Sequence, residues 1–156
     1  MIKKKIVLMV SKQFPETHSR RGDETEFERK IELGNKIHTI RGNFHLWAHN
    51  AEKMKKGTYY LSIRQWSGKP YKSKHKEIFQ KHSPIGVQPI ELFYHAENDT
   101  ISAKIDGVDW LDADCCRIAK NDGLSVQDFK EWFFGKAPSE DKVFNGVIIH
   151  FTDFRY

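Results

Sequence analysis

A chain of 156 residues, of which 38% are hydrophobic and 13% aromatic, is long enough to bury one core and is close to the commonest size of a globular domain. Its longest apolar runs are far shorter than the roughly 20 residues that a membrane-spanning helix needs, and no signal peptide is recognisable at its start. The composition therefore argues against a membrane protein and predicts a single cytoplasmic domain over residues 1–156, while the net charge of +5 favours a polyanionic partner.

The cysteines and histidines show neither a disulfide framework nor a metal site. Cys115 and Cys116 are neighbours in sequence, whereas a disulfide framework needs separated partners. His45 and His49 have the spacing of a helical pair but lack the adjacent glutamate of a metalloprotease helix. No glycine-rich phosphate loop occurs. We therefore expect reduced cysteines, no bound metal and no cofactor.

The start of the chain predicts a strand followed by a long polar loop. The β-branched run over residues 3–10 is typical of a buried strand. Residues 12–25 contain Phe14, Pro15 and a cluster of acidic and basic side chains. Unstructured loops of this length are uncommon in compact domains unless they bind or cover something. This segment is therefore either a functional loop or a mobile surface flap.

Two short helices are predicted next, on either side of a short strand. Residues 27–33 have apolar side chains at helical spacing, and Gly34 stops this helix. Residues 43–56 repeat the pattern, with Asn43 in the N-cap position. Residues 37–41 lie between them and predict an extended strand.

Further strands are predicted in the remaining chain. Five segments show alternation or β-branched runs: 58–66, 74–82, 87–97, 100–107 and 143–154. We place a turn at Asn98 and Asp99. We place Pro84 and Pro89 at edges or in loops, because proline cannot donate a hydrogen bond to a central ladder.

Two more helices complete the prediction. One is expected to begin near Asp109, to end at Asp122 and Gly123, and to turn apolar side chains toward the core; these are Trp110, Leu111, Cys115 and Ile118. The other follows Ser125, which is expected to cap it. About six strands with three or four short helices predict an α+β fold, most naturally built on an antiparallel barrel.

The segment GNKIHTIR, residues 34–41, concentrates the reactive groups of the chain. It places an amine, an imidazole, a hydroxyl and a guanidinium close together, at Lys36, His38, Thr39 and Arg41. Alternation along a strand puts Thr39 and Arg41 on one face and His38 on the other. Lys36 either follows this alternation and lies opposite Thr39, or belongs to the preceding loop and can reach the Thr39 side.

The pattern Gly-x-Lys-x-x-Thr-x-Arg in residues 34–41 resembles the signature of the ASCH domain, a small β-barrel similar to the PUA RNA-binding domain. Residues 119–124 show a second, weaker similarity, to the Ala-x-x-acidic-Gly segment with which this family opens a helix and places a carboxylate near the lysine. The resemblance implies a PUA-like antiparallel β-barrel with flanking helices and a cleft where the two segments meet.

The resemblance also implies a possible reaction. Some small ASCH proteins are amidohydrolases that remove the acetyl group of N(4)-acetylcytidine with a lysine, a threonine and a glutamate, which match Lys36, Thr39 and Asp122. Neutral Lys36 would then be the base for the Thr39 nucleophile, and Asp122 would orient the amine or protonate the departing nitrogen. A lysine is a base only if burial or a cationic neighbour such as Arg41 lowers its pKa. Aspartate is one methylene shorter than the family's glutamate, and an ion pair with Asp122 would keep Lys36 protonated and suited to holding a phosphate or a base edge.

Basic and aromatic residues gather in residues 53–81, which contain nine lysine and arginine residues and a single glutamate. This stretch suits a polyanion or is a solvated hairpin face. Within it, Arg64, Trp66, Lys69 and Tyr71 surround a predicted turn. They would stack a base and grip phosphate, or else the rings pack the hairpin and Arg64 pairs with an acid.

Two functional hypotheses follow. The first is a module that binds RNA or a modified nucleoside in the cleft; the second is an amidohydrolase of acylated nucleosides. A polymer would need the basic residues of 53–81 to form a continuous track away from the cleft, whereas a free nucleoside would not. A protein-interaction role, with Lys36 and Arg41 in structural salt bridges, is a third reading. The expected site residues are, for catalysis, Lys36, Thr39 and Asp122 and, for ligand contact, Arg41, His38, Arg64, Trp66, Lys69 and Tyr71.

Overall fold

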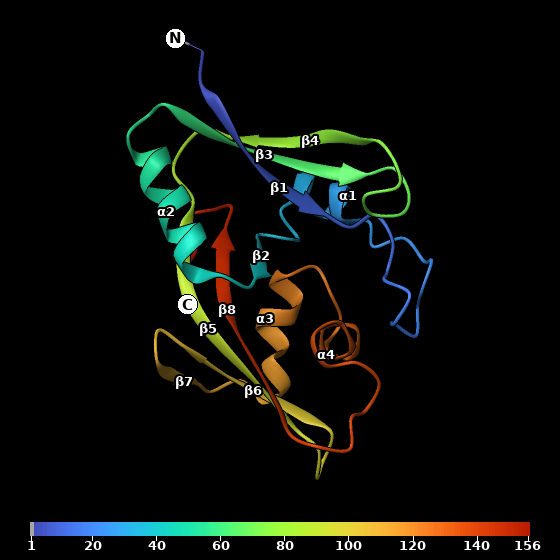
Figure 1. The fold of residues 1–156 in the computed structure, drawn as a ribbon. Helices are drawn as coiled ribbons and strands as arrows, with labels where there is room; N and C mark the ends of the chain where they lie inside the picture. Colours follow the sequence, from blue (N-terminus) through green and yellow to red (C-terminus); the bar gives the residue numbers. More distant parts are fainter. Residues whose placement is uncertain (1) are drawn as a thin grey trace.

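A computed structural model describes residues 2–156, which form eight strands and four α-helices (Figure 1). In chain order the elements are β1 (Lys4–Val10), α1 (Phe27–Glu32), β2 (His38–Arg41), α2 (Phe44–Lys55), β3 (Tyr59–Trp66), β4 (His75–Lys81), β5 (Gly86–His95), β6 (Thr100–Ile105), β7 (Val108–Trp110), a 3₁₀ turn (Ala113–Cys115), α3 (Cys116–Asn121), α4 (Val126–Phe134) and β8 (Lys142–His150). The predicted α+β class is confirmed.

The strands form two sheets. One has the order β1-β3-β4 and the other the order β2-β8-β5-β6-β7. Figure 1 shows the three-stranded sheet at the top and the long strands β5, β6 and β8 below it, with α3 and α4 on one side and α2 on the other. No ladder within residues 2–156 joins the two sheets.

The strand arrangement corrects the prediction of about six antiparallel strands. There are eight strands, and β1 pairs with β3 in parallel. A parallel pair needs a long crossover connection, and the segment from α1 to α2 provides it. The other described pairs are antiparallel.

The hydrophobic core lies between the sheets and the helices. Its most deeply buried members come from both sheets and from α2, α3 and α4: Leu8, Met54, Leu61, Ile63, Leu92, Ile118, Phe129 and Ile148. Alternate residues of β5 are buried from Gln88 onward, as the period of an extended strand requires. The core thus fixes β2 and α3, the elements that flank the site described below.

The segment after β6 differs from its prediction. Asp106 and Gly107 have φ values of 54° and 76°, which make a tight hairpin turn, and β7 returns along β6 with Ile105 opposite Val108. The helix expected from Asp109 begins only at Cys116. Leu111, expected in the core, is 95% exposed.

Pro89 lies inside β5, a central strand, and not at an edge or in a loop as predicted. The β5–β6 ladder starts one residue later, at Ile90 opposite Ile105. The carbonyl of Pro89 accepts the N–H of Asp106 in the turn beyond β6. The backbone N–H that proline lacks would therefore face the position just beyond the end of the β5–β6 ladder, so its absence removes no hydrogen bond between these strands.

Several predicted boundaries are confirmed. The Asn43 side chain accepts the N–H of Leu46 at the start of α2, and Ser125 accepts the N–H of Asp128 at the start of α4. No helix within residues 2–156 has the length and apolar character to cross a membrane.

Candidate functional site

The segment between α1 and β2 lies against the C-terminal end of α3. Gly34 adopts a φ of 74° and ends α1 as predicted, and the N–H of Lys36 donates to the carbonyl of Lys30 at 2.9 Å. The N–H of Ile37 donates to the carbonyl of Asn121, also at 2.9 Å. Lys36 therefore belongs to the loop before β2, and strand alternation does not fix the direction of its side chain.

Lys36 and Asp122 form a buried ion pair, with 2% and 4% of their surface exposed. The Lys36 Nζ donates to the Asp122 carboxylate at 3.0 Å and to its backbone carbonyl at 2.7 Å, and it lies 4.3 Å from the centre of the Phe27 ring. Gly123 makes this approach possible, because a Cβ on Gly123 would lie only 3.2 Å from the Lys36 Cβ.

The two members of this pair perturb each other's protonation. Burial lowers the pKa of Lys36, and the charge and hydrogen bond of Asp122 oppose that fall only in part. Burial by itself raises the pKa of Asp122, but the charge of Lys36 and the contacts of His38 and Lys36 together outweigh it and lower that pKa. Both pKa values are thus lowered, that of Lys36 chiefly because its side chain has lost almost all contact with solvent. The site therefore holds a carboxylate beside an amine that releases its proton more readily than an exposed lysine does.

A second row of side chains supports Asp122 from behind. The Tyr156 hydroxyl accepts a hydrogen bond from the Asn121 amide at 3.0 Å and lies 2.6 Å from the His38 Nε2. The other ring nitrogen of His38, Nδ1, is on the side of Asp122. That atom lies 3.4 Å from the Asp122 carboxylate. Burial also lowers the pKa of His38, so its neutral form is favoured.

Arg41 lies at the end of β2 without a carboxylate partner. Its guanidinium donates to Thr39 Oγ1 at 2.8 Å, to the Ile40 carbonyl at 3.0 Å and to the Met9 carbonyl at 2.6 Å. No acidic oxygen of the described residues lies within 4.0 Å of it. The guanidinium is thus held in place by neutral acceptors and forms no direct ion pair with the described residues, while the charge of Asp122 acts on it across the cavity.

These groups meet in one cavity of about 290 Å³. Its chemically distinctive lining residues are Lys36, Thr39, Arg41, Trp66, Tyr71 and Asp122. The rings of Trp66 and Tyr71 lie 5.2 Å apart between centroids, and Tyr71 is 90% exposed at the rim. The cavity therefore combines hydrogen-bond donors and acceptors with two aromatic surfaces.

Three of the predicted ligand contacts lie outside this cavity. His38 is fully buried behind Asp122. Arg64 donates to His75 at 2.8 Å and lies 3.8 Å from Glu77, which is the acid pairing that we considered as its alternative. Lys69 lines a neighbouring cavity and lies 3.3 Å from Glu16.

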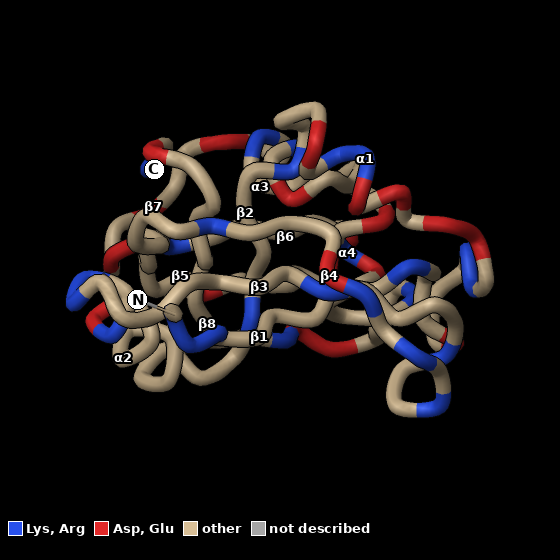
Figure 2. Tube along the Cα trace, turned by 90° about the horizontal axis from the view of Figure 1, so that it is seen from above, with Lys and Arg blue, Asp and Glu red and all other residues tan. Residues whose placement is uncertain are grey.

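The basic residues of 53–81 lie at both ends of β3 and beside it. Lys53, Lys55 and Lys56 precede this strand and Lys69, Lys72 and Lys74 follow it, while Arg64 lies within it and Lys76 and Lys81 lie on the paired strand β4. Figure 2 shows Lys and Arg at both ends of the trace, interleaved with Asp and Glu. Acidic residues interrupt the basic stretch, because Arg64 lies 3.8 Å from Glu77 and Lys76 lies 3.4 Å from Glu28.

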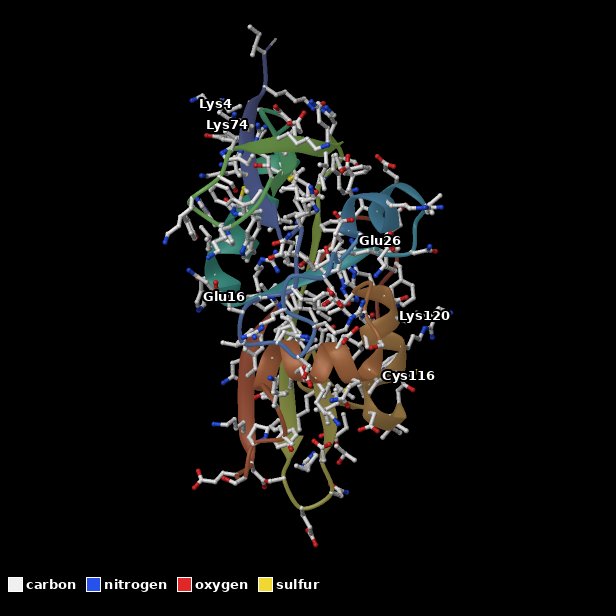
Figure 3. All side chains as sticks on the ribbon, turned by 90° about the vertical axis from the view of Figure 1, so that its right-hand side faces the viewer. Lys4, Glu16, Glu26, Lys74, Cys116 and Lys120 are labelled. Carbon is white, nitrogen blue, oxygen red and sulfur yellow. The ribbon has the colours of Figure 1, made fainter. Side chains whose placement is uncertain are left out.

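The loop of residues 12–25 is fastened to α4. His18 is buried, with its Nε2 3.2 Å from the Asp128 carbonyl, and Ser19 donates to Glu131 through its backbone and its hydroxyl. Arg20 forms a 2.6 Å hydrogen bond with the Asp128 carboxylate. Figure 3 shows Glu16 on this loop, on the opposite side of the view from Cys116, which projects from α3. These bonds fasten residues 18–20 of the loop to α4.

Sequence reasoning missed two supporting residues. Phe27 was expected only as an apolar helix residue, yet its ring faces the Lys36 ammonium. Tyr156 gave no signal at all, because its contacts with Asn121 and His38 join segments far apart in the chain. For Phe27 a partial signal was present, because its helix α1 directly precedes the motif of residues 34–41.

The cavity thus brings an amine, a hydroxyl, a guanidinium and a carboxylate into one lining, from Lys36, Thr39, Arg41 and Asp122. Residues 2–156 contain no cluster of three or more His, Cys, Asp or Glu side chains suited to a metal ion. A scan of family models and searches of curated proteins and of solved structures found no match to this chain.

Proposed function

We propose that this chain is an ASCH-like domain that binds RNA through a single unpaired or modified nucleoside held in the cavity of Lys36, Thr39, Arg41 and Asp122. The observation that supports this most is the meeting of the motif side chains with the rings of Trp66 and Tyr71 around one cavity. Single-stranded RNA is commonly recognised by such a combination of base stacking and hydrogen bonds to base edges.

The polar groups of the cavity suit a base edge. The Lys36 ammonium and the Arg41 guanidinium donate hydrogen bonds, the Asp122 carboxylate accepts them, and the Thr39 hydroxyl does both. A nucleobase presents donors and acceptors side by side on one edge. The Arg41 guanidinium, which forms no direct ion pair with the described residues, favours a carbonyl oxygen or a phosphate at that end of the cavity.

The size of the cavity favours one nucleoside over a helix. Pockets for drug-sized ligands have about 300–1,000 Å³, and this one has about 290 Å³. The acids that pair with Arg64 and Lys76 interrupt the basic stretch of 53–81 and also favour a short contact over a long polymer track. Two sheets around a shared core, with short helices outside, are compatible with the PUA-like barrel that the sequence motif implies.

A binding measurement with a matched pair of arginine variants tests this function. The four ribonucleosides and N(4)-acetylcytidine are titrated into the protein by calorimetry. Arg41→Gln is expected to lower the affinity of the best binder at least about tenfold, because charge-assisted hydrogen bonds are worth about 1.5–3 kcal/mol. Arg64→Gln, which removes an equal charge outside the cavity, is expected to leave affinity unchanged. Absence of binding by every nucleoside, or equal losses in both variants, would refute the proposal.

A second candidate, the amidohydrolase, is favoured by one observation: burial lowers the pKa of Lys36. In this mechanism the neutral Lys36 amine takes the proton of Thr39 as its oxygen bonds to the acetyl carbon of N(4)-acetylcytidine. The C–N bond breaks as protonated Lys36 passes this proton to the departing cytidine amine, and water then attacks the acetyl–Thr39 ester, which gives acetate and restores the Thr39 hydroxyl. Because the pKa of Asp122 is lowered, its carboxylate would orient Lys36 rather than donate a proton.

Turnover assays separate this candidate from simple binding. N(4)-acetylcytidine is incubated with the protein, and cytidine is measured by chromatography. Lys36→Met is expected to abolish release. Lys30→Met is the matched control, because Lys30 is bound to the same helix end through the Gly123 carbonyl but does not line the cavity. Release that persists in Lys36→Met would disprove the assigned role of Lys36.

A further inference from the structure

A larger cavity of about 520 Å³ adjoins the nucleoside cavity. The two cavities share Ser11, Trp66 and Pro70 in their linings, so Trp66 and Pro70 stand between them. On its other side the larger cavity is bounded by the loop that follows β1, through Phe14 and Pro15. A ligand that extends from the first cavity past Trp66 therefore enters the second.

The charge of the second cavity is strongly positive. Lys12, Arg21, Lys69 and Lys72 line it together with one acid, Glu16. Glu16 lies 3.3 Å from Lys69, and within residues 2–156 the other three basic side chains have no acidic oxygen within 4.0 Å. Three cations around one cavity favour a ligand with at least one phosphate.

Trp66 supplies the aromatic surface of this cavity, at the boundary where it lines both cavities. Phe14 also lines the cavity but is only 4% exposed, with the Arg20 guanidinium 4.6 Å from its ring centre and Trp132 packed edge-on at 5.6 Å, so it supports the wall from within. An aromatic ring such as that of Trp66 stacks on any nucleobase, whereas a free phosphate would leave it unused.

Both sides of the cavity are held by hydrogen bonds before any ligand arrives. The N–H of Phe14 donates to the Asp23 carbonyl at 2.9 Å, and the loop is fastened to α4 as described above. On the opposite side, Ser67 donates to the Lys74 carbonyl at 2.8 Å, and Gly68 donates to the Ser73 hydroxyl at 3.1 Å. Less ordering is required on binding when the walls are already fixed.

From these features we infer that the second cavity holds the phosphate and base of the nucleotide joined to the nucleoside in the first, so that the unit recognised is a single-stranded dinucleotide. This inference rests on the proposed function. It adds a second subsite, formed by the 12–22 segment and the β3–β4 turn, in which Lys12, Arg21 and Lys72 face the phosphate.

Titrations of nucleosides and dinucleotides into the intact protein test the inference. The probes are the four ribonucleosides and the homodinucleotides ApA, CpC, GpG and UpU, at two salt concentrations. The best dinucleotide is expected to bind at least about tenfold more tightly than its nucleoside, with an affinity that falls as salt rises because a phosphate is neutralised.

A double variant locates the phosphate. Lys12→Ala with Arg21→Ala is expected to remove most of the dinucleotide advantage and to leave nucleoside affinity unchanged. The control, Lys55→Ala with Lys56→Ala, removes the same charge at the end of α2, away from both cavities, and is expected to change neither affinity.

The outcomes separate the two proposals. Nucleoside binding without any gain for the dinucleotide would overturn the second subsite and leave the proposed function standing. Equal losses of dinucleotide affinity in the two double variants would also overturn it, because the effect would be one of overall charge. Absence of binding by every probe would refute both.

Discussion

Removing the charge of Asp122 should expose the cost of burying Lys36. In Asp122→Asn the Lys36 Nζ keeps its 2.7 Å bond to the backbone carbonyl but loses its carboxylate partner in a site where only 2% of its surface meets solvent. Breaking a buried ion pair from one side typically costs about 3–5 kcal/mol. Because the carbonyl bond and the Phe27 ring remain, we expect the lower end, about 3 kcal/mol, which corresponds to a fall in Tm of about 6–12 °C for a chain of this size.

A double-mutant cycle with Lys36→Met shows whether the loss belongs to the pair. Urea denaturation of wild type, both single variants and the double variant gives the coupling free energy. The double variant is expected to be more stable than Asp122→Asn alone, since no unpaired charge is left in the core. Losses below about 1 kcal/mol in Asp122→Asn, together with additive effects in the double variant, would refute the ion-pair reasoning.

Three further predictions concern the same region. The pKa of Asp122 is lowered in the folded protein, so the unfolded chain binds its proton more readily. Its contribution to stability is therefore present above about pH 4 and is lost as the pH falls below that value. Asp122→Asn should reduce this loss of stability in denaturation curves measured from pH 6 to pH 3. Tyr156→Phe should lower stability by about 1–3 kcal/mol in thermal melting, because His38 and Asn121 lose a buried hydrogen-bond partner. Tyr60→Phe is the control and should change stability little, because the Tyr60 hydroxyl makes no hydrogen bond within the described chain. Equal effects of the two variants would contradict the role of the hydrogen bonds between Tyr156, His38 and Asn121. Gly123→Ala and Gly57→Ala should each lower stability by about 1–2 kcal/mol, because both glycines have a positive φ. Gly123→Ala should lower it by about 1 kcal/mol more, because its new Cβ would press on Lys36, whereas Gly57 faces open space. Equal losses would show that Lys36 moves aside without cost.

Local chemistry made most of the elements predictable from the sequence. Asn43 and Ser125 sit at helix starts because their side chains satisfy backbone donors, and Gly34 ends a helix because it adopts a left-handed conformation. The helix predicted to begin near Asp109 begins only at Cys116. The sequence contained a signal for this, because Asp106 and Gly107 form a dipeptide typical of a tight hairpin turn. Pro89 was misplaced because only the pairing register shows that its missing donor falls at a ladder end.

The site was predictable in part. The family resemblance implied a carboxylate near Lys36 but left open whether Asp122 reaches it, and the structure brings the two to 3.0 Å. Tyr156 and the second cavity could not be predicted, because each depends on contacts between segments that only the tertiary fold brings together. For Arg64, the open choice between ligand contact and an acid partner required the register that places it opposite Glu77.

The strand that bears Thr39 and Arg41 has a consequence for how the protein is made. Within the described sheet β2 pairs only with β8, so a strand synthesised early has no sheet partner until almost the whole chain has followed. Pairing across such a separation is entropically costly and slow. In a nascent chain without β8, the strand that bears Thr39 and Arg41 is unpaired, so the cavity that these residues line is completed only when β8 docks. Ligand binding would thus report that folding is complete.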